Sequence, residues 1–159
     1  MLNNLLMTFQ ANRKLTYDIL ESLNDADIEK KWNRPGLDTF SKHIQEMAAV
    51  TNAYAEAMET GNMDFSKVPS VYEFNDKLKK EELKELLEVS DQKLREIIEE
   101  EKYKPEVFWF DMNLPVDIHF VNIISHEVYH QGMMTLFLYQ NKIQIPSSMM
   151  ENWSLPEVE

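Results

Sequence analysis

Residues 2–23 read LNNLLMTFQANRKLTYDILESL, and their pattern decides the class of fold. The apolar positions recur every three or four residues with polar residues between them; they are Leu2, Leu5, Leu6, Phe9, Leu15, Ile19, Leu20 and Leu23. This spacing is typical of one apolar face of an α-helix that packs against other elements. We therefore predict a first helix over residues 2–23 in an all-α protein.

Three further helices are predicted, over about residues 39–60, 78–102 and 117–141. Asp38 or Thr39 is placed to cap the second helix, and Gly61 suits its C-terminal stop. Residues 61–76 carry few periodic positions and form a long connection, which is long enough for a crossover. Residues 103–116 are expected to be irregular and aromatic, and residues 143–159 to form an extended C-terminal tail on a single domain of residues 1–159.

Composition bounds the classes of function. The chain has 159 residues and a formal charge of -12, which argues against nucleic acid as a partner. It contains no cysteine, so a protein thiol can serve neither as nucleophile nor as metal ligand. No signal peptide and no run of about 20 apolar residues is evident, so we expect no membrane partner and a cytoplasmic location. A chain of this length can bury a core unaided, so a metal would be functional.

Three of the four histidines lie in the predicted fourth helix. His126 and His130 are four residues apart, which separates them by about 40° around the helix and about 6 Å along it, so one ion could meet both. His119 is excluded as a further ligand, because its backbone lies about 16 Å from that of His130 along the helix. The third ligand must come from another element.

His43, on the predicted second helix, is the only other histidine. Three imidazoles would hold a divalent ion and leave positions for water or substrate, as in a reactive site. Imidazole ligation suits Zn, Ni, Fe or Cu, and three nitrogens alone do not choose among them. We expect Zn or Ni first, with Mn, Fe or Cu as alternatives. A histidine pair at this spacing also decorates helices without a metal, so the spacing alone leaves that reading open.

Two carboxylates lie near the proposed ligands in sequence. Glu46 and Glu127 are weak catalytic candidates that could orient an imidazole or move protons, but a solvated surface carboxylate is the favoured interpretation of either residue alone. Residues 126–130, HEVYH, also match the H-E-x-x-H helix of zinc proteases, in which the glutamate activates a metal-bound water. The continuation has no third histidine and no strand to align a peptide, so we rank a protease below the other readings.

The whole pattern resembles the DinB superfamily, which is related to the YfiT-type hydrolases and the bacillithiol transferases. The resemblance rests on NRPG at residues 33–36 leading into FSKHI at 40–44, and on SHEVYHQG at 125–132. It implies a four-helix bundle with up-down-down-up topology and a long crossover between the second and third helices. It also implies that His43, His126 and His130 are the metal ligands.

The resemblance implies a metal-dependent hydrolase or a transferase of low-molecular-weight thiols, acting on a small molecule. For a transferase, a positive group such as Arg34 or Lys42 is expected near the mouth of the site. The alternative is a non-catalytic bundle with a vestigial metal site whose apolar surface mediates dimerisation, and a homodimer is compatible with either function.

Overall fold

The chain is mostly helical. The computed structural model describes residues 1–158 and contains, in chain order, α1 (Leu2–Ser22), α2 (Asp25–Glu29), α3 (Phe40–Thr60), α4 (Lys80–Glu99), β1 (Glu106–Trp109), β2 (Met112–Pro115), α5 (Val116–Gln140) and α6 (Ser147–Trp153). The prediction of an all-α protein is confirmed in that the chain is mostly helical, but it did not include the two-stranded sheet. The small sheet and the short helices α2 and α6 are additional to the four predicted helices. None of the described helices is long and apolar enough to cross a bilayer.

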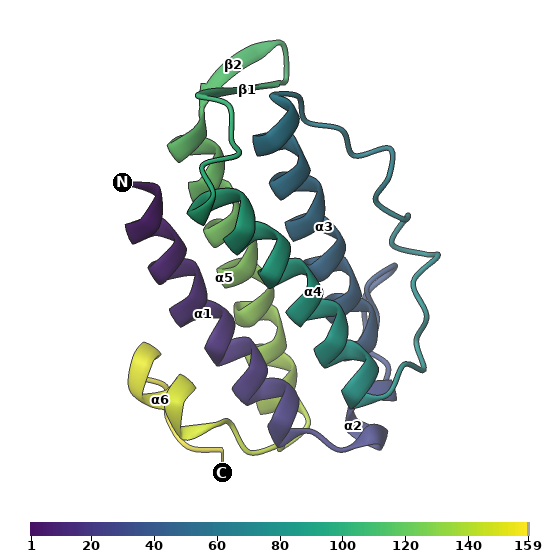
Figure 1. The fold of residues 1–159 in the computed structure, drawn as a ribbon. Coiled ribbons are helices and arrows are strands. Elements are labelled where there is room, and N and C mark those ends of the chain that lie inside the picture. The colour runs from purple at the N-terminus through teal and green to yellow at the C-terminus, as the bar shows by residue number, and fades with distance from the viewer. Residues whose placement is uncertain (159) are drawn as a thin grey trace.

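The four long helices α1, α3, α4 and α5 lie side by side (Figure 1). The chain leaves α3 at one end and returns along the molecule before α4 begins, so α3 and α4 run in the same direction (Figure 1). Thr39 caps the start of α3, where its hydroxyl accepts a hydrogen bond from the Lys42 amide at 3.2 Å. Gly61 ends α3 with φ of 82°, a left-handed conformation that suits glycine.

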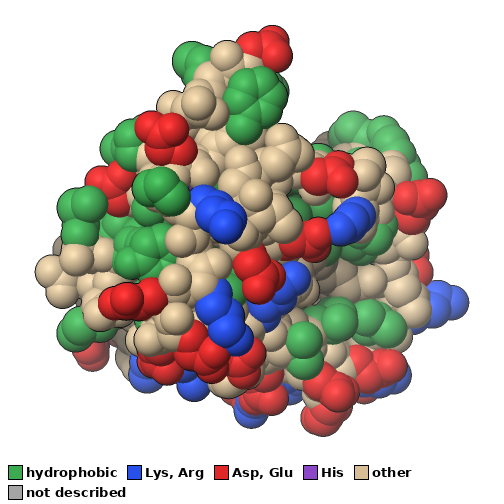
Figure 2. All heavy atoms as spheres, turned by 45° about the horizontal axis from the view of Figure 1, so that its top comes forward, with side chains coloured by type: hydrophobic (Ala, Val, Ile, Leu, Met, Phe, Trp, Pro, Cys, Tyr) green, Lys and Arg blue, Asp and Glu red, His purple; other side chains and the backbone are tan. Residues whose placement is uncertain are grey.

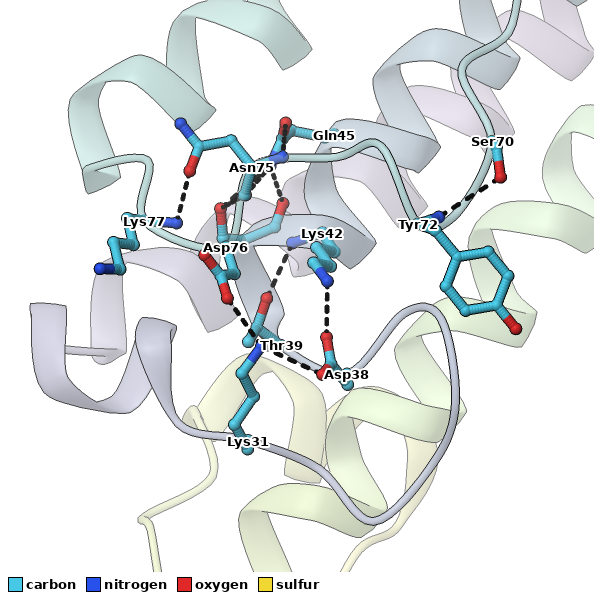
Figure 3. Close-up of polar contacts among 11 residues, drawn as sticks. Lys31, Asp38, Thr39, Lys42, Gln45, Ser70, Tyr72, Asn75, Asp76 and Lys77 are labelled. Atoms are coloured by element: carbon cyan, nitrogen blue, oxygen red, sulfur yellow. Dashed lines mark hydrogen bonds and ion pairs between the residues drawn. The ribbon is translucent and has the colours of Figure 1, made fainter.

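The returning connection is fixed to α3 by polar contacts (Figure 3). The Asn75 amide donates to Gln45 Oε1 at 3.1 Å, and Ser41 Oγ donates to the Asn75 carbonyl at 2.7 Å. Lys31 Nζ lies 2.7 Å from Asp76 Oδ2, which ties the connection to the chain before α3. These contacts satisfy backbone groups that the irregular segment would otherwise leave unpaired.

Two segments differ from the sequence expectation. Residues 103–116 contain an antiparallel hairpin in which Glu106 pairs with Pro115 and Trp109 with Met112. Phe110 and Asp111 form its turn with φ of 48° and 59°, without the glycine that normally signals such a turn. The side chain of Phe110 is 75% exposed, and hydrophobic and acidic side chains share the face seen in Figure 2.

The C-terminal tail is the second difference. It contains the short helix α6 instead of being extended throughout, and Met149 of that helix is buried against the core. Pro146 precedes the first residue of α6, where a proline has no helical amide bond to lose. The tail therefore adds to the core beside α1, with which α6 makes contact.

The core is divided along the helices. One apolar cluster includes Leu20, Phe40 and Phe137, and the other includes Phe9, Met58 and Phe120. Between them, the middle turns of the four long helices contribute buried polar side chains; these are Arg13, Thr16, Thr51, Ser90, Glu127, His130 and Gln131. Buried polar groups require partners or ligands. This polar layer is therefore where a functional site is to be sought.

Candidate metal centre

The donor groups come from two facing helices. His43 and Glu46 are three residues apart on α3, and His126 and His130 are four residues apart on α5. Residues at these spacings share one helix face, so each pair points in one direction. Because α3 and α5 pack together, the two pairs meet in the polar layer.

Three of the four groups converge on one point. Glu46 Oε2 lies 3.1 Å from His126 Nε2 and 2.8 Å from His130 Nε2. The two Nε2 atoms are 3.1 Å apart, and one donor atom from each residue lies within 4.8 Å of the others. This grouping is close enough for a single ion about 2 Å from each donor. Sequence reasoning named Glu46 only as a weak catalytic candidate, although its i, i+3 spacing from His43 is a signal for this position.

His43 approaches His130 from the other side. Its Nδ1 lies 2.8 Å from His130 Nδ1, whereas Glu46 and His126 face His130 Nε2. The side chain of His43 is fully buried, and its ring stacks on Trp32 with centroids 4.1 Å apart. Contact with His130 therefore brings His43 into the cluster, but it lies outside the three-residue donor group.

The electrostatics favour a deprotonated donor set. Burial, with the neighbouring His130, lowers the pKa of His43 to about 3, and burial also lowers the pKa of His130. Burial alone would raise the pKa of Glu46, but hydrogen bonds from His126 and His130 lower it to about 2. At neutral pH the cluster therefore presents the Glu46 carboxylate beside the uncharged imidazoles of His43 and His130. Metal ions bind this form, so the donor set fits a divalent cation.

His119 lies outside the cluster. Its buried ring contacts Tyr54 and Trp109, and its Nε2 is 3.2 Å from the Tyr54 carbonyl oxygen. It is one turn into α5 and belongs to the end of the molecule that carries the hairpin. This position agrees with its exclusion as a ligand by distance along the helix.

Glu127 faces away from the histidine donors. It pairs with Arg13 at 3.3 Å and accepts a hydrogen bond from the Thr16 hydroxyl, so it points toward α1. In a zinc protease the corresponding glutamate must reach the metal-bound water. The partners of Glu127 give no support to that role.

Arg13 is the centre of a second buried cluster, which sequence reasoning missed. From α1 its guanidinium reaches Thr51 of α3 at 2.9 Å, Asp91 of α4 at 3.1 Å and Glu127 of α5 at 3.3 Å. The side chain is only 2% exposed. One arginine thus contacts all three other long helices. In the sequence, Arg13 occupies a polar position of an amphipathic helix, where a surface residue is expected. Only its burial in the structure reveals its role.

Comparisons with known proteins agree with this fold. A family model described as the DinB family matches residues 1–141. A crystal structure described as a DinB-like protein from Bacillus cereus ATCC 10987 superposes with a TM-score of 0.71 and 15% identity, covering 91% of this chain and 95% of that one. At this identity the likeness concerns the fold alone. The search of curated proteins found no match.

Proposed function

The chain belongs to the DinB family, and from this premise we propose that it is a metalloenzyme with one divalent ion held by His126 and His130. The proposal rests on one observation: a carboxylate oxygen of Glu46 and one ring nitrogen each of His126 and His130 lie within 4.8 Å of one another. We further propose that the four long helices form the family's up-down-down-up bundle, which supports the site between α3 and α5.

The third protein ligand has two candidates. The family resemblance supports His43, and the observed donor group supports Glu46. If Glu46 is the ligand, His43 acts by accepting a hydrogen bond from His130 Nδ1–H. That bond would keep His130 Nε2 unprotonated and aimed at the ion, a role that a neighbouring residue commonly plays for a ligating histidine.

We propose that the reaction is hydrolysis or transfer of a low-molecular-weight thiol, on a small-molecule substrate. The ion would supply Lewis acidity, which lowers the pKa of a bound water or thiol. The surrounding residues hold the imidazoles in place: Trp32 stacks on His43, and the burial of His130 excludes water from its ring. Zn and Ni are the first ions to test, followed by Mn, Fe and Cu.

Metal content of purified protein, measured by plasma mass spectrometry, tests the proposal. We expect about one equivalent in the wild type and none retained in His126→Ala or His130→Ala. His119→Ala is the matched control, because it removes a buried histidine of the same helix outside the donor group. It should keep its metal. Equal metal content in all four proteins would contradict the proposed site.

His43→Ala and Glu46→Gln separate the two candidates for the third ligand. Substitution of the residue that binds the ion should abolish metal binding. Substitution of a residue that only positions His130 should weaken metal affinity by about 10- to 100-fold, and the protein should still bind one ion. A screen of ester and amide hydrolysis and of thiol conjugation with the loaded protein then selects the reaction. A wild type that binds no added Zn or Ni would support the non-catalytic alternative.

A further inference from the structure

The outward face of α5 carries apolar side chains and no exposed charge. Within residues 118–140 the only Asp, Glu, Lys or Arg is Glu127, whose side chain is buried and points toward α1. A helix that is apolar on its outer as well as its inner face is typical of a helix with neighbours on both sides. Four apolar side chains of the outer face are nevertheless between 42% and 58% exposed; they are Ile118, Val121, Tyr129 and Leu136.

The other long helices present acidic side chains to solvent. Glu21 of α1, Glu59 of α3 and Glu85 of α4 are all exposed. In a chain with a formal charge of -12, two copies that met through these faces would bring like charges together, which is destabilising. The outer face of α5 contributes no such charge, so a second copy can approach it without that cost.

Gly132 lies in the middle of this face, in the interior of α5. A glycine inside a helix is destabilising relative to alanine. Apart from its own turn of helix, a Cβ on Gly132 would meet no atom of the described residues within 4 Å, so no contact within residues 1–158 requires the glycine. Close packing of another molecule over this position explains the absence of a side chain.

A hollow of about 360 Å³ lies on one side of Gly132. Val128 and Thr135 of α5 line one wall of the hollow, and Trp153 and Leu155 of the C-terminal tail line the other. Trp153 is 44% exposed, so the hollow has an aromatic rim that remains open to a neighbour. An apolar side chain from outside can therefore be buried here.

The hollow and an apolar ridge lie at mirrored angles around Gly132. At 100° per residue, Val128 and Thr135 are turned about 40° and 60° to one side of Gly132. Tyr129 and Leu136, which form the ridge, are turned about 60° and 40° to the other side and lie only about 1.5 Å further along the axis. A two-fold axis that is parallel to α5 and passes in front of Gly132 therefore places the ridge of each copy opposite the hollow of the other.

We propose that the outer face of α5 is the two-fold contact of a homodimer, in which Tyr129 and Leu136 of each copy pack into the hollow beside Gly132 of the other copy. The proposal does not rest on the metal centre. The exposed side chains extend from Ile118 to Leu136, over about 27 Å of helix. A standard interface of about 800 Å² per partner has a similar width, whereas a small molecule in the hollow would leave the ridge uncovered.

Sedimentation equilibrium of the purified protein tests the proposal. At micromolar concentration we expect a mass of twice the 18.8 kDa of one chain. Leu136→Glu places a carboxylate in the apolar hollow of the other copy, twice per dimer, and should raise the dissociation constant by about 100-fold or more. Gly132→Leu should weaken the dimer as strongly, because its side chain blocks the close contact. Its helix content, measured by circular dichroism, should equal that of the wild type, because leucine favours a helix more than glycine does.

Val89→Glu is the matched control. Val89 of α4 is 58% exposed and Leu136 is 57% exposed, so the two substitutions add the same charge at equally exposed positions of different helices. The control should dimerise as the wild type does. The proposal is overturned if the wild type stays monomeric at its highest soluble concentration, which would leave the face to a different partner. It is also overturned if Leu136→Glu dimerises as tightly as the wild type, or if Val89→Glu loses the dimer equally.

Cross-linking tests the position of the two-fold axis. The chain has no cysteine, so Ser125→Cys and Val89→Cys each carry a single thiol. Ser125 is exposed and lies about 20° from Gly132 around α5, so the proposed axis brings its two copies close together. A short bismaleimide should join Ser125→Cys into covalent dimers in high yield and Val89→Cys only through random collisions. Equal yields in the two variants would overturn the proposed contact.

Discussion

The two buried polar clusters of the core differ in how their charges are balanced. In the Arg13 cluster, one guanidinium lies between Asp91 and Glu127, and the hydroxyls of Thr16 and Thr51 complete the hydrogen bonds. In the histidine cluster, two imidazole Nε2 atoms and a carboxylate oxygen, all potential metal ligands, lie within 4.8 Å of one another. The first cluster contains its own cation, and the second lacks one.

This difference separates a structural role from a binding role. A cluster whose charges pair internally stabilises the arrangement of the helices, because removal of one partner leaves a buried charge uncompensated. A cluster of imidazole and carboxylate groups without a cation of its own is complementary to a cation from outside. Both clusters use α5, where Glu127 directly follows His126, so the Arg13 cluster also fixes the rotation of the helix that carries the histidine pair.

The largest effect is expected from Arg13→Ala. The substitution leaves Asp91 and Glu127 buried without a cation and should lower the free energy of unfolding by about 3–5 kcal/mol. Urea denaturation of the metal-free protein measures this loss. Lys14→Ala removes an exposed cation of the same helix that is paired with Asp18, and should cost no more than about 1 kcal/mol. Equal losses in the two variants would show that the Arg13 cluster has no special structural role.

Metal addition should stabilise the wild type through the histidine cluster. At a free ion concentration of 100 times the dissociation constant, the free energy of unfolding should rise by about 2.7 kcal/mol. His130→Ala should show no such rise, and a folded Arg13 variant should still show it. Calorimetric melts with and without Zn or Ni provide the measurement, and a rise in His130→Ala as large as in the wild type would place the ion elsewhere.

Acid should destabilise the metal-free protein through His43. Burial holds its folded pKa at about 3, below the ordinary value of 6.5, so only the unfolded chain takes up this proton as the pH falls through 6.5. The stability contribution is present above that pH and is lost below it, by about 2 kcal/mol between pH 7 and pH 5. Urea denaturation of the wild type and of His43→Gln at both pH values tests this. If the two proteins lose the same unfolding free energy between pH 7 and pH 5, the loss does not come from His43.

The smallest effect is expected from Thr16→Val. The Thr16 hydroxyl donates to Glu127 and accepts from Gln131 Nε2 at 3.0 Å, so its loss should lower the free energy of unfolding by about 1 kcal/mol. Metal affinity should not change. Thr8→Val is the control, because the hydroxyl of Thr8 is exposed and donates to the Asn4 carbonyl within its own helix. Indistinguishable variants would mean that this bond contributes nothing to the Arg13 cluster.

The sequence predicted those features that follow from local periodicity. The four long helices follow from apolar spacing, and the meeting of His126 with His130 follows from their four-residue separation. The hairpin was missed because Phe110 and Asp111 adopt positive φ without a glycine to signal it. The short helix α6 was missed because a proline-bounded segment of seven residues carries little periodic signal.

The side-chain contacts between different helices could not be predicted in the same way. Nothing in the local sequence shows that Arg13 is buried, or that Glu46 reaches the histidine pair while Glu127 points to α1. These outcomes depend on the packing of α1, α3 and α5, because a rotation of about 100° separates adjacent residues of a helix and decides which cluster each side chain joins. The family resemblance supplied His43, but not its position on the far side of His130.

X-ray absorption spectroscopy of the Zn- or Ni-loaded protein tests the proposed metal site, because it counts the imidazoles bound to the ion. For the wild type we expect at least the two rings of His126 and His130, and three if His43 is also a ligand. His126→Ala should lose one imidazole or the ion altogether. The proposed site would be refuted if the spectrum of the loaded wild type contained no imidazole scattering, or if it were unchanged in the double variant lacking His126 and His130.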